Sequence, residues 1–278
     1  MWIRIGYDIE LALNSPTTLL GALHVHPSRA HDLQAPEAFS VEPALPVTQY
    51  RDGFDNLISR IDVPAGVGTL RLRNHATLAD SGQPDALPSH ARQHPLQELP
   101  DALFRFLLPS RYCEVDSELM AFAWQRFGHL PESGVRVQAV CDYVHGHLRF
   151  DYMQARANRT AVQGWQEGVG VCRDFAHLAV TLCRCLNIPA RYVTGYLGDI
   201  GVPPVPVPMD FSAWFEVWLD GAWHTFDARH NAPRIGRIVM ARGRDAADVA
   251  ITTLFGWHEL RRFDVVTGQM QQPVGALA

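Results

Sequence analysis

The stretch GVGVCRDFAHL, at residues 168–178, places a cysteine at the point where a glycine-rich segment meets a predicted helix. We predict that this helix covers residues 172–186, because Asn187 and Pro189 follow it as stop signals. A helix N-terminus has unpaired N–H groups and the positive end of the helix dipole, and both favour a thiolate. We therefore expect a lowered pKa at Cys172 and backbone donors that can hold an oxyanion. The alternative is a buried, unreactive thiol at a helix start.

Three predicted strands follow this helix, and the second and third form a hairpin around an Asp-Gly pair. This dipeptide favours a two-residue type I′ turn. In that register Asp227 is the diagonal neighbour of Ser212 on the same face of the sheet. His224 and His230 lie on the opposite face, so neither reaches that position. The alternative is a three-residue loop, which sets His230 against Ser212 and turns Asp227 away.

The cysteine motif, the strand IPARYVTGYL at 188–197 and the segment DFSAWFEVWLDGAWHTFD at 210–227 together resemble the transglutaminase-like superfamily, a group of papain-like cysteine enzymes. The motifs LPSRYC at 108–113 and HNAPRIGRI at 230–238 are similar to those of bacterial members with an N-terminal β domain. The resemblance covers nearly the whole chain. It implies a papain-like core and a thiol that attacks peptide or glutamine-type amides, followed by hydrolysis or amine transfer.

The resemblance also implies roles for particular residues of this chain. It implies that Cys172 is the nucleophile and that Asp227 orients the catalytic imidazole. The base of the family is a histidine directly before Ala-Trp, and this chain has Ser212 at that position. Papain-like enzymes commonly use a side-chain donor for the oxyanion, and Gln163 or Trp165 is the candidate here. Replacing Ser212 with histidine is therefore expected to restore a Cys-His-Asp site.

Two classes of function follow from the missing histidine. General acid–base participation contributes about 10²–10⁴-fold to a rate, so its loss predicts a weakened enzyme. The first hypothesis is a cysteine peptidase or amidase with an incomplete Cys-His-Asp triad. The second is a catalytically impaired pseudoenzyme that binds a peptide or protein in the same cleft. Both hypotheses make a peptide or protein the partner.

The periodicity of the sequence predicts two domains. Residues 1–88 alternate apolar and polar side chains between turn clusters, which predicts an antiparallel β domain, either a sandwich or a barrel. Residues 89–270 change to helical periodicity followed by strands, which predicts an α+β domain with the cysteine-bearing helix packed on an antiparallel sheet. The connecting stretch at 81–100 is rich in Pro, Ser, Gln and His, as is typical of a linker. Residues 271–278 are expected to form a C-terminal tail.

The composition excludes several kinds of chemistry. All 24 basic residues are arginine, so neither a Schiff-base lysine nor a P-loop lysine is present. A net charge of −5 gives no basic surplus for nucleic acid. We expect no membrane span, no cofactor and no metal, because no suitable apolar run or ligand spacing occurs. The five cysteines are an odd number, and Asp8 and Glu10 interrupt any signal-peptide core, so we expect a reducing cytoplasm. The oligomeric state is left open.

Overall fold

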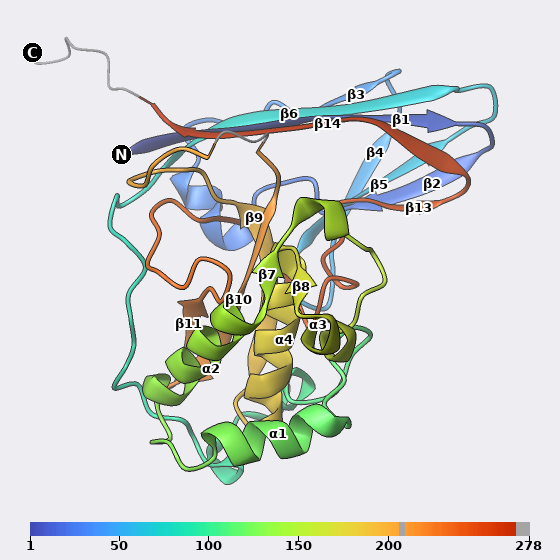
Figure 1. Cartoon of the computed structure of the whole chain (residues 1–278). Helices are drawn as coiled ribbons and strands as arrows, with labels where there is room; N and C mark the ends of the chain where they lie inside the picture. Colours follow the sequence, from blue (N-terminus) through green and yellow to red (C-terminus); the bar gives the residue numbers. More distant parts are fainter. Residues whose placement is uncertain (206–208, 271–278) are drawn as a thin grey trace, which may run out of the picture.

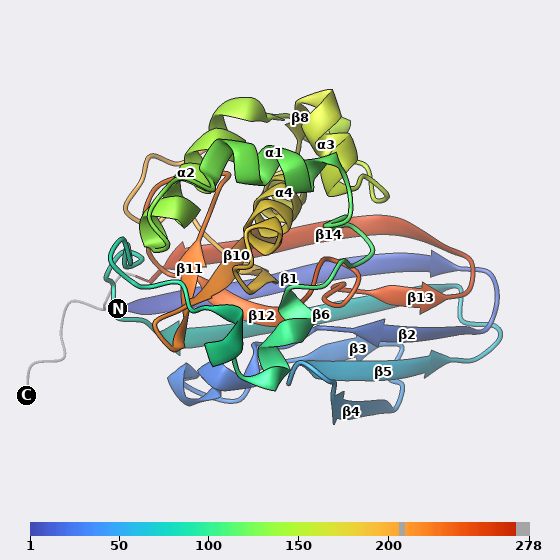
Figure 2. The same ribbon diagram turned by 90° about the horizontal axis from the view of Figure 1, so that it is seen from below.

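The computed structural model describes residues 1–205 and 209–270 and has an α+β fold with two parts, drawn in Figures 1 and 2. One part is a β-sandwich, and the other is a group of helices packed on a separate antiparallel sheet. The fold class predicted from the sequence is therefore confirmed.

The β-sandwich consists of two four-stranded antiparallel sheets that share one apolar core. The sheets have the strand orders β14-β1-β6-β3 and β13-β2-β5-β4. Along β1, Ile3, Ile5 and Ile9 are buried in this core, as the period-two pattern predicts. The elements are β1 (Trp2–Leu13), β2 (Thr17–Gly21), η1 (Pro27–Asp32), β3 (Ser40–Glu42), β4 (Val47–Arg51), β5 (Leu57–Val63), β6 (Thr69–Ala79), β13 (Thr253–Phe255) and β14 (His258–Gln269).

The last two strands of the described chain belong to this sandwich. β14 pairs with β1, and β13 pairs with β2. Residues 253–269 therefore make their strand pairs with the first part of the chain, whereas the predicted second domain extends to residue 270. Their alternating pattern marks them as strands but contains no information about a partner so distant in the sequence. The boundary near residue 88 stays a prediction, and the predicted tail at 271–278 lies outside the described residues.

The helical part surrounds α4, which lies at its centre (Figure 1). α4 packs against β10 and β9 of a sheet with the order β11-β10-β9-β12, and α1, α2 and α3 pack around α4. The elements are η2 (Leu96–Glu98), η3 (Asp101–Phe106), α1 (Glu118–Phe127), α2 (Gly134–His147), β7 (Arg149–Phe150), η4 (Tyr152–Gln154), α3 (Ala161–Glu167), β8 (Val169–Gly170), α4 (Cys172–Cys185), β9 (Ala190–Tyr196), β10 (Ser212–Leu219), β11 (Ala222–Phe226) and β12 (Ile238–Gly243).

The two parts pack against each other at the start of β10. The ring of Phe211 lies 6.0 Å from that of Tyr7 and 5.7 Å from that of Phe263, measured between centroids. Tyr7 and Phe263 come from β1 and β14 of the sandwich, and Phe211 directly precedes Ser212. The sandwich therefore supports the segment that leads into β10.

The predicted linker is docked against the helical part over residues 91–93. The backbone carbonyl of Ala91 accepts a hydrogen bond from Gly134 at 2.9 Å. The buried side chain of Gln93 donates to the carbonyl of Leu186 at 2.9 Å. These contacts fix the connection just upstream of η2.

Candidate active site

Cys172 is the first residue of α4, and Val171 is its N-cap. The carboxylate of Asp174 accepts a hydrogen bond from the backbone N–H of Val171 at 2.9 Å. Gly170 has no room for a side chain, because a Cβ atom there would lie 2.6 Å from the Cβ of Asp174. The glycine-rich approach to the cysteine therefore permits close packing under the helix start. Cys172 is partly exposed, whereas the other four cysteines are buried.

Two cavities meet at Cys172. The first has a volume of about 290 Å³, and Tyr152, Arg229 and His230 line this cavity but not the second. The second has a volume of about 350 Å³, and the loop 155–157 lines this cavity but not the first. The residues that line both cavities are Cys172, Asp210, Phe211 and Ser212. The thiol therefore lies in the middle of a cleft that has space for an extended chain on either side.

Burial raises the pKa of the Cys172 thiol to about 11. The negative charge of Asp210 adds to this rise, while Arg229 and the backbone amide of Ala213 act in the opposite direction. The helix N-terminus alone predicts a lowered pKa, and that prediction is wrong for this structure. The thiol packs against an apolar cluster that includes Tyr192, and loss of water there disfavours the charged thiolate. A nearby base is therefore needed to generate the thiolate near neutral pH.

The predicted hairpin register is confirmed from the turn as far as the pair Phe215–Phe226, while Asp227 is not paired in the sheet. Leu219 pairs with Ala222, and the turn residues Asp220 and Gly221 have φ values of 48° and 77°. Positive φ at both central residues is the signature of a type I′ turn. However, the strand β11 ends at Phe226, and the chain turns away from the sheet after it.

Asp227 and His230 form a hydrogen-bonded pair within that turn. Oδ1 of Asp227 accepts hydrogen bonds from the backbone N–H groups of Arg229 and His230 at 2.9 and 3.0 Å. Nδ1 of His230 lies 2.8 Å from Oδ2 of Asp227. The prediction that His230 lies on the opposite face of the sheet is wrong, because the chain does not continue the strand beyond Phe226. The structure thus brings together a carboxylate and an imidazole that the strand register separates.

Arg237 is the second partner of Asp227, with Nη2 at 2.9 Å from Oδ2. Burial alone would raise the pKa of Asp227, but the hydrogen bond from His230 and the charge of Arg237 outweigh it and hold the pKa well below its usual range. An ionised carboxylate only accepts hydrogen bonds, so Nδ1 of His230 donates to Asp227. A guanidinium only donates, so Nε2 of His230 is the acceptor of the bond from Nη1 of Arg229 at 2.6 Å.

Ser212 begins β10 and lines both cavities beside Cys172. It pairs with Gly195 of β9, and its carbonyl accepts a hydrogen bond from the hydroxyl of Thr194 at 3.3 Å. His224, in contrast, lies near the turn of the hairpin, where its Nε2 is 3.2 Å from the carbonyl oxygen of Leu219. The structure therefore keeps Ser212 at the cleft and engages His224 elsewhere.

Gln163 and Trp165 have other roles in this structure. Oε1 of Gln163 accepts a hydrogen bond from the backbone of Thr160 at 3.1 Å, which completes a capping box at the start of α3. Nε1 of Trp165 donates to the hydroxyl of Tyr143 at 2.7 Å. Neither residue lines either of the two cavities beside Cys172. We therefore assign neither of them to the oxyanion.

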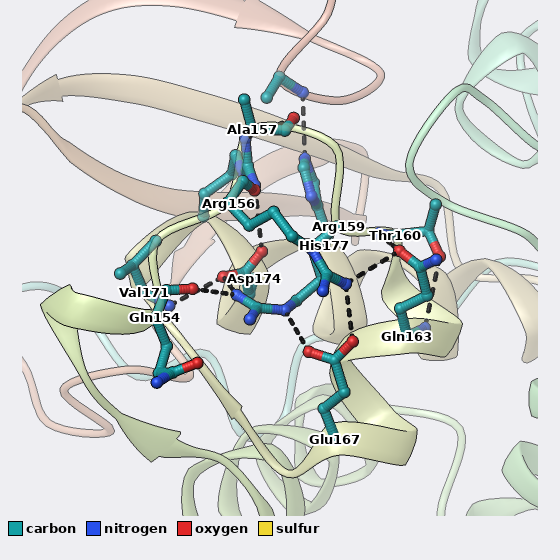
Figure 3. A network of polar contacts seen from close by, with 12 residues as sticks. Gln154, Arg156, Ala157, Arg159, Thr160, Gln163, Glu167, Val171, Asp174 and His177 are labelled. Atoms are coloured by element: carbon teal, nitrogen blue, oxygen red, sulfur yellow. Dashed lines mark hydrogen bonds and ion pairs between the residues drawn. The ribbon is translucent and has the colours of Figure 1, made fainter.

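A network of charged side chains lies beneath the start of α4 (Figure 3). Nη1 of Arg159 is 3.0 Å from Oδ2 of Asp174, and its Nε is 2.9 Å from Oε2 of Glu167. Arg159 and Asp174 are each only 2% exposed. Arg156 adds a bond to Glu167 at 2.6 Å. Because both arginines belong to the loop that forms one wall of the cleft, the network ties this wall to the cysteine-bearing helix.

Within residues 1–205 and 209–270, no group of three or more His, Cys, Asp or Glu side chains is arranged to hold a metal ion. Within the same ranges, every helix is too short or too polar to span a membrane.

Residues 125–228 match the transglutaminase-like superfamily. This segment of the chain is similar to that superfamily. The matched segment includes Cys172, Ser212 and Asp227, whereas His230 lies just beyond its end. The resemblance found in the sequence is therefore confirmed, together with the α+β core that it implies.

Similar proteins extend the match beyond this transglutaminase-like core. A candidate cysteine protease of Cytophaga hutchinsonii has a solved structure with a TM-score of 0.82 and 29% identity, covering 99% of this chain and 92% of that chain. An uncharacterized protein of Mycobacterium leprae is 28% identical over 153 residues, which are 54% of each chain. A Mycobacterium tuberculosis protein is 28% identical over 219 residues, covering 72% of this chain and 68% of the relative. The match thus spans about half of the Mycobacterium leprae protein, while the structural similarity includes the sandwich.

Proposed function

We propose that this transglutaminase-like protein is a cysteine peptidase or amidase whose nucleophile is Cys172 and whose base is His230. The observation that supports this is the Asp227–His230 hydrogen bond of 2.8 Å at the cavity that Cys172 lines. An imidazole with Nδ1 on a carboxylate and a lone pair on Nε2 is equipped to act as a general base. His230 then takes the role that the family gives to a histidine at the position of Ser212.

The proposed reaction starts from a neutral thiol and a neutral imidazole. Nε2 of His230 takes the thiol proton while the sulfur of Cys172 bonds to the carbonyl carbon of the amide. The imidazolium then gives this proton to the amide nitrogen as the C–N bond breaks, and the amine leaves. Water or a second amine attacks the resulting thioester, releases the acyl group and returns the proton to Cys172. Throughout the cycle, the Asp227 carboxylate orients the ring and stabilises its positive charge.

A peptide-binding or protein-binding pseudoenzyme is the second candidate. Two observations favour it: Ser212 occupies the position of the family base, and burial raises the pKa of Cys172 to about 11. In this function the cleft holds a peptide on both sides of Cys172 without turnover. The two candidates differ in whether turnover depends on His230.

The experiment measures kcat/KM on a generic peptide amide. We expect Cys172→Ala to abolish turnover and His230→Gln to lower kcat/KM by about 10²–10⁴-fold. His224→Gln is the matched control and leaves turnover unchanged, because its ring binds near the hairpin turn. If His230→Gln has no effect while Ser212→His raises turnover, the base has been lost rather than moved. Wild-type protein that binds peptides without turnover favours the pseudoenzyme.

We also propose that the protein works in the reducing cytoplasm. All five cysteines are free, as is typical of proteins in a reducing compartment. Fractionation of the source cells tests this, with the protein expected among cytoplasmic markers and its thiols open to labelling. Recovery with disulfide-bonded extracytoplasmic proteins contradicts it.

A further inference from the structure

Arg229 differs from two other arginine residues of the cleft in how its charge is balanced. Arg234 lies 3.5 Å from the carboxylate of Asp199, and Arg156 lies 2.6 Å from that of Glu167. In the part of the chain that the structure describes, no carboxylate oxygen lies within 4.0 Å of the Arg229 guanidinium. A cleft arginine without an acidic partner has its charge available for a ligand.

The guanidinium of Arg229 is held in place but only partly hydrogen-bonded. Its central carbon lies 3.9 Å from the centroid of the Phe150 ring, a cation–π contact that fixes its plane. Nη1 donates to Nε2 of His230 at 2.6 Å. Nε is buried and has no partner among the described residues. Because arginine has five donors, this side chain retains unused donors at the cavity that it shares with Cys172.

We propose that Arg229 binds a carboxylate of the substrate close to the scissile amide and that this binding releases His230. A guanidinium binds a carboxylate through two parallel hydrogen bonds, which are stronger than one bond to a neutral ring nitrogen. The incoming carboxylate thus replaces Nε2 as the partner of Nη1. Nε2 is then free to take the proton of Cys172. The substrate class is an acidic peptide, recognised through an Asp or Glu side chain or through its free C-terminus.

The same cavity limits where the acidic group can bind. Asp199 is engaged by Arg234 and by the backbone N–H of Val205 at 2.8 Å. Asp210 lines both cavities, and its negative charge acts on Cys172. A substrate carboxylate next to Asp210 is repelled, so we expect it to bind only on the Arg229 side. The preference for acid should therefore be confined to one position of the peptide relative to the scissile bond.

Alkylation of the thiol tests the recognition step without any need for turnover. Iodoacetate and iodoacetamide react with the same sulfur but differ by one negative charge. We measure the ratio of their rate constants at Cys172 by mass spectrometry. Arg229→Gln should lower the iodoacetate-to-iodoacetamide ratio about tenfold, the effect of one charge-assisted hydrogen bond. Arg229→Lys keeps the charge but loses the two parallel donors of the guanidinium. Its ratio should therefore lie between those of the wild-type protein and Arg229→Gln.

Arg149→Gln is the matched control for this measurement. It removes the same charge close to Phe150, but Arg149 is exposed and paired with Asp151 at 2.9 Å. Its ratio should stay within about twofold of the wild-type value, as expected for a screened surface charge. An equal ratio in wild-type protein, Arg229→Gln and Arg229→Lys overturns the proposal.

Peptide pairs then identify the source of the carboxylate. One arm compares Glu with Gln at each position flanking the scissile bond, and the other compares a free with an amidated C-terminus. We expect about tenfold higher kcat/KM for the acid in one arm, lost in Arg229→Gln and retained in Arg149→Gln. No preference in either arm overturns the proposed substrate class. The release of His230 rests on the proposed function. Wild-type protein without turnover contradicts that function, whereas the iodoacetate-to-iodoacetamide ratio still shows whether Arg229 binds a carboxylate.

Discussion

The two walls of the Cys172 cleft differ in how completely their charges are paired. On the α4 side, Arg159 binds both Asp174 and Glu167, and the central pair is almost fully buried. On the other side, the guanidinium of Arg229 is the only hydrogen-bond partner of Nε2 of His230 among the described residues, and that guanidinium has no carboxylate partner there. A buried charge with all its partners fixes a geometry, whereas a partly paired group can exchange its partner during a reaction.

This difference fits what each wall has to do in the proposed cycle. The sulfur of Cys172 must stay in one place, so its helix start benefits from the rigid Asp174–Arg159 contact. The imidazole of His230 has to accept a proton and give it back, so its Nε2 must be able to change partners. Variants in each wall should therefore affect different quantities: stability on the α4 side and turnover on the His230 side.

The largest expected effect is on stability, from Asp174→Ala. The variant breaks the buried Arg159–Asp174 ion pair and leaves Glu167 as the remaining carboxylate partner of Arg159. Breaking a buried pair costs up to about 3–5 kcal/mol of unfolding free energy. It also removes the acceptor of the Val171 N–H at the start of α4. Chemical denaturation measures the loss.

The double variant Asp174→Ala with Arg159→Met is the control for Asp174→Ala, since it also removes the buried guanidinium that has lost one of its two carboxylate partners. It should recover a large part of the lost stability. A loss below about 1 kcal/mol in the single variant contradicts a structural role for this wall.

Asp227→Asn should act mainly on turnover. The amide no longer fixes the tautomer of His230 or stabilises its charge, so we expect kcat to fall by about 10²–10⁴-fold. Alkylation of Cys172 with iodoacetamide is the companion measurement, and its rate at high pH, where the thiolate forms without a base, should change little. A fall in both quantities by the same factor would point to a distorted cleft instead.

The same variant has a predicted effect on acid stability. The pKa of Asp227 is held below its usual value of about 4, so its ionised form stabilises the fold above that pH. This contribution is lost progressively as the pH falls from about 4, where the carboxylate of the unfolded chain takes up its proton, towards the lower pKa of the folded state. Asp227→Asn should therefore make the acid-side dependence of stability shallower. An unchanged slope in acid denaturation contradicts the lowered pKa.

Much of the nucleophile's side of the site is predictable from the sequence. The glycine-rich approach and the helix stop signals fix the place of Cys172, and the Asp-Gly turn fixes the hairpin register. These features are local, so neighbouring residues determine them. The pKa of Cys172 is different, because it depends on burial by strands far away in the sequence.

The base side of the site could not be derived from strand periodicity. The predicted register extends the strand past Phe226 and therefore places His230 on the opposite face of the sheet from Ser212. A signal for the turn was present: Asp227 is an acidic residue whose side chain can cap a turn, and Asn231 with the following Ala-Pro favours a break. Asn231 indeed has a φ of 48°. The partner strands of residues 253–269 were similarly inaccessible, since strand pairing across the chain depends on tertiary packing.

The pH dependence of Cys172 alkylation distinguishes the effect of the thiol pKa from the effect of the exposure of the thiol to the reagent. Because burial raises its pKa to about 11, the rate of iodoacetamide labelling should keep rising with pH up to that value. An ordinary thiol levels off near pH 8.5. Cys172 should still be labelled before the other four cysteines, since it alone is partly exposed. A plateau near neutral pH would mean that the His230 wall already holds a thiolate in the resting protein.

The smallest expected effect comes from Arg156→Gln, at the outer end of the charged network. Arg156 is exposed and bonds Glu167, which is itself only partly buried. Exposed ion pairs are screened by water and salt, so we expect a loss of stability below about 1 kcal/mol. Arg173 still donates to the carbonyl of Ala157 at 2.9 Å and keeps the loop against α4. A loss as large as that of Asp174→Ala would show that the whole network, and not its buried centre, determines the position of the cysteine-bearing helix.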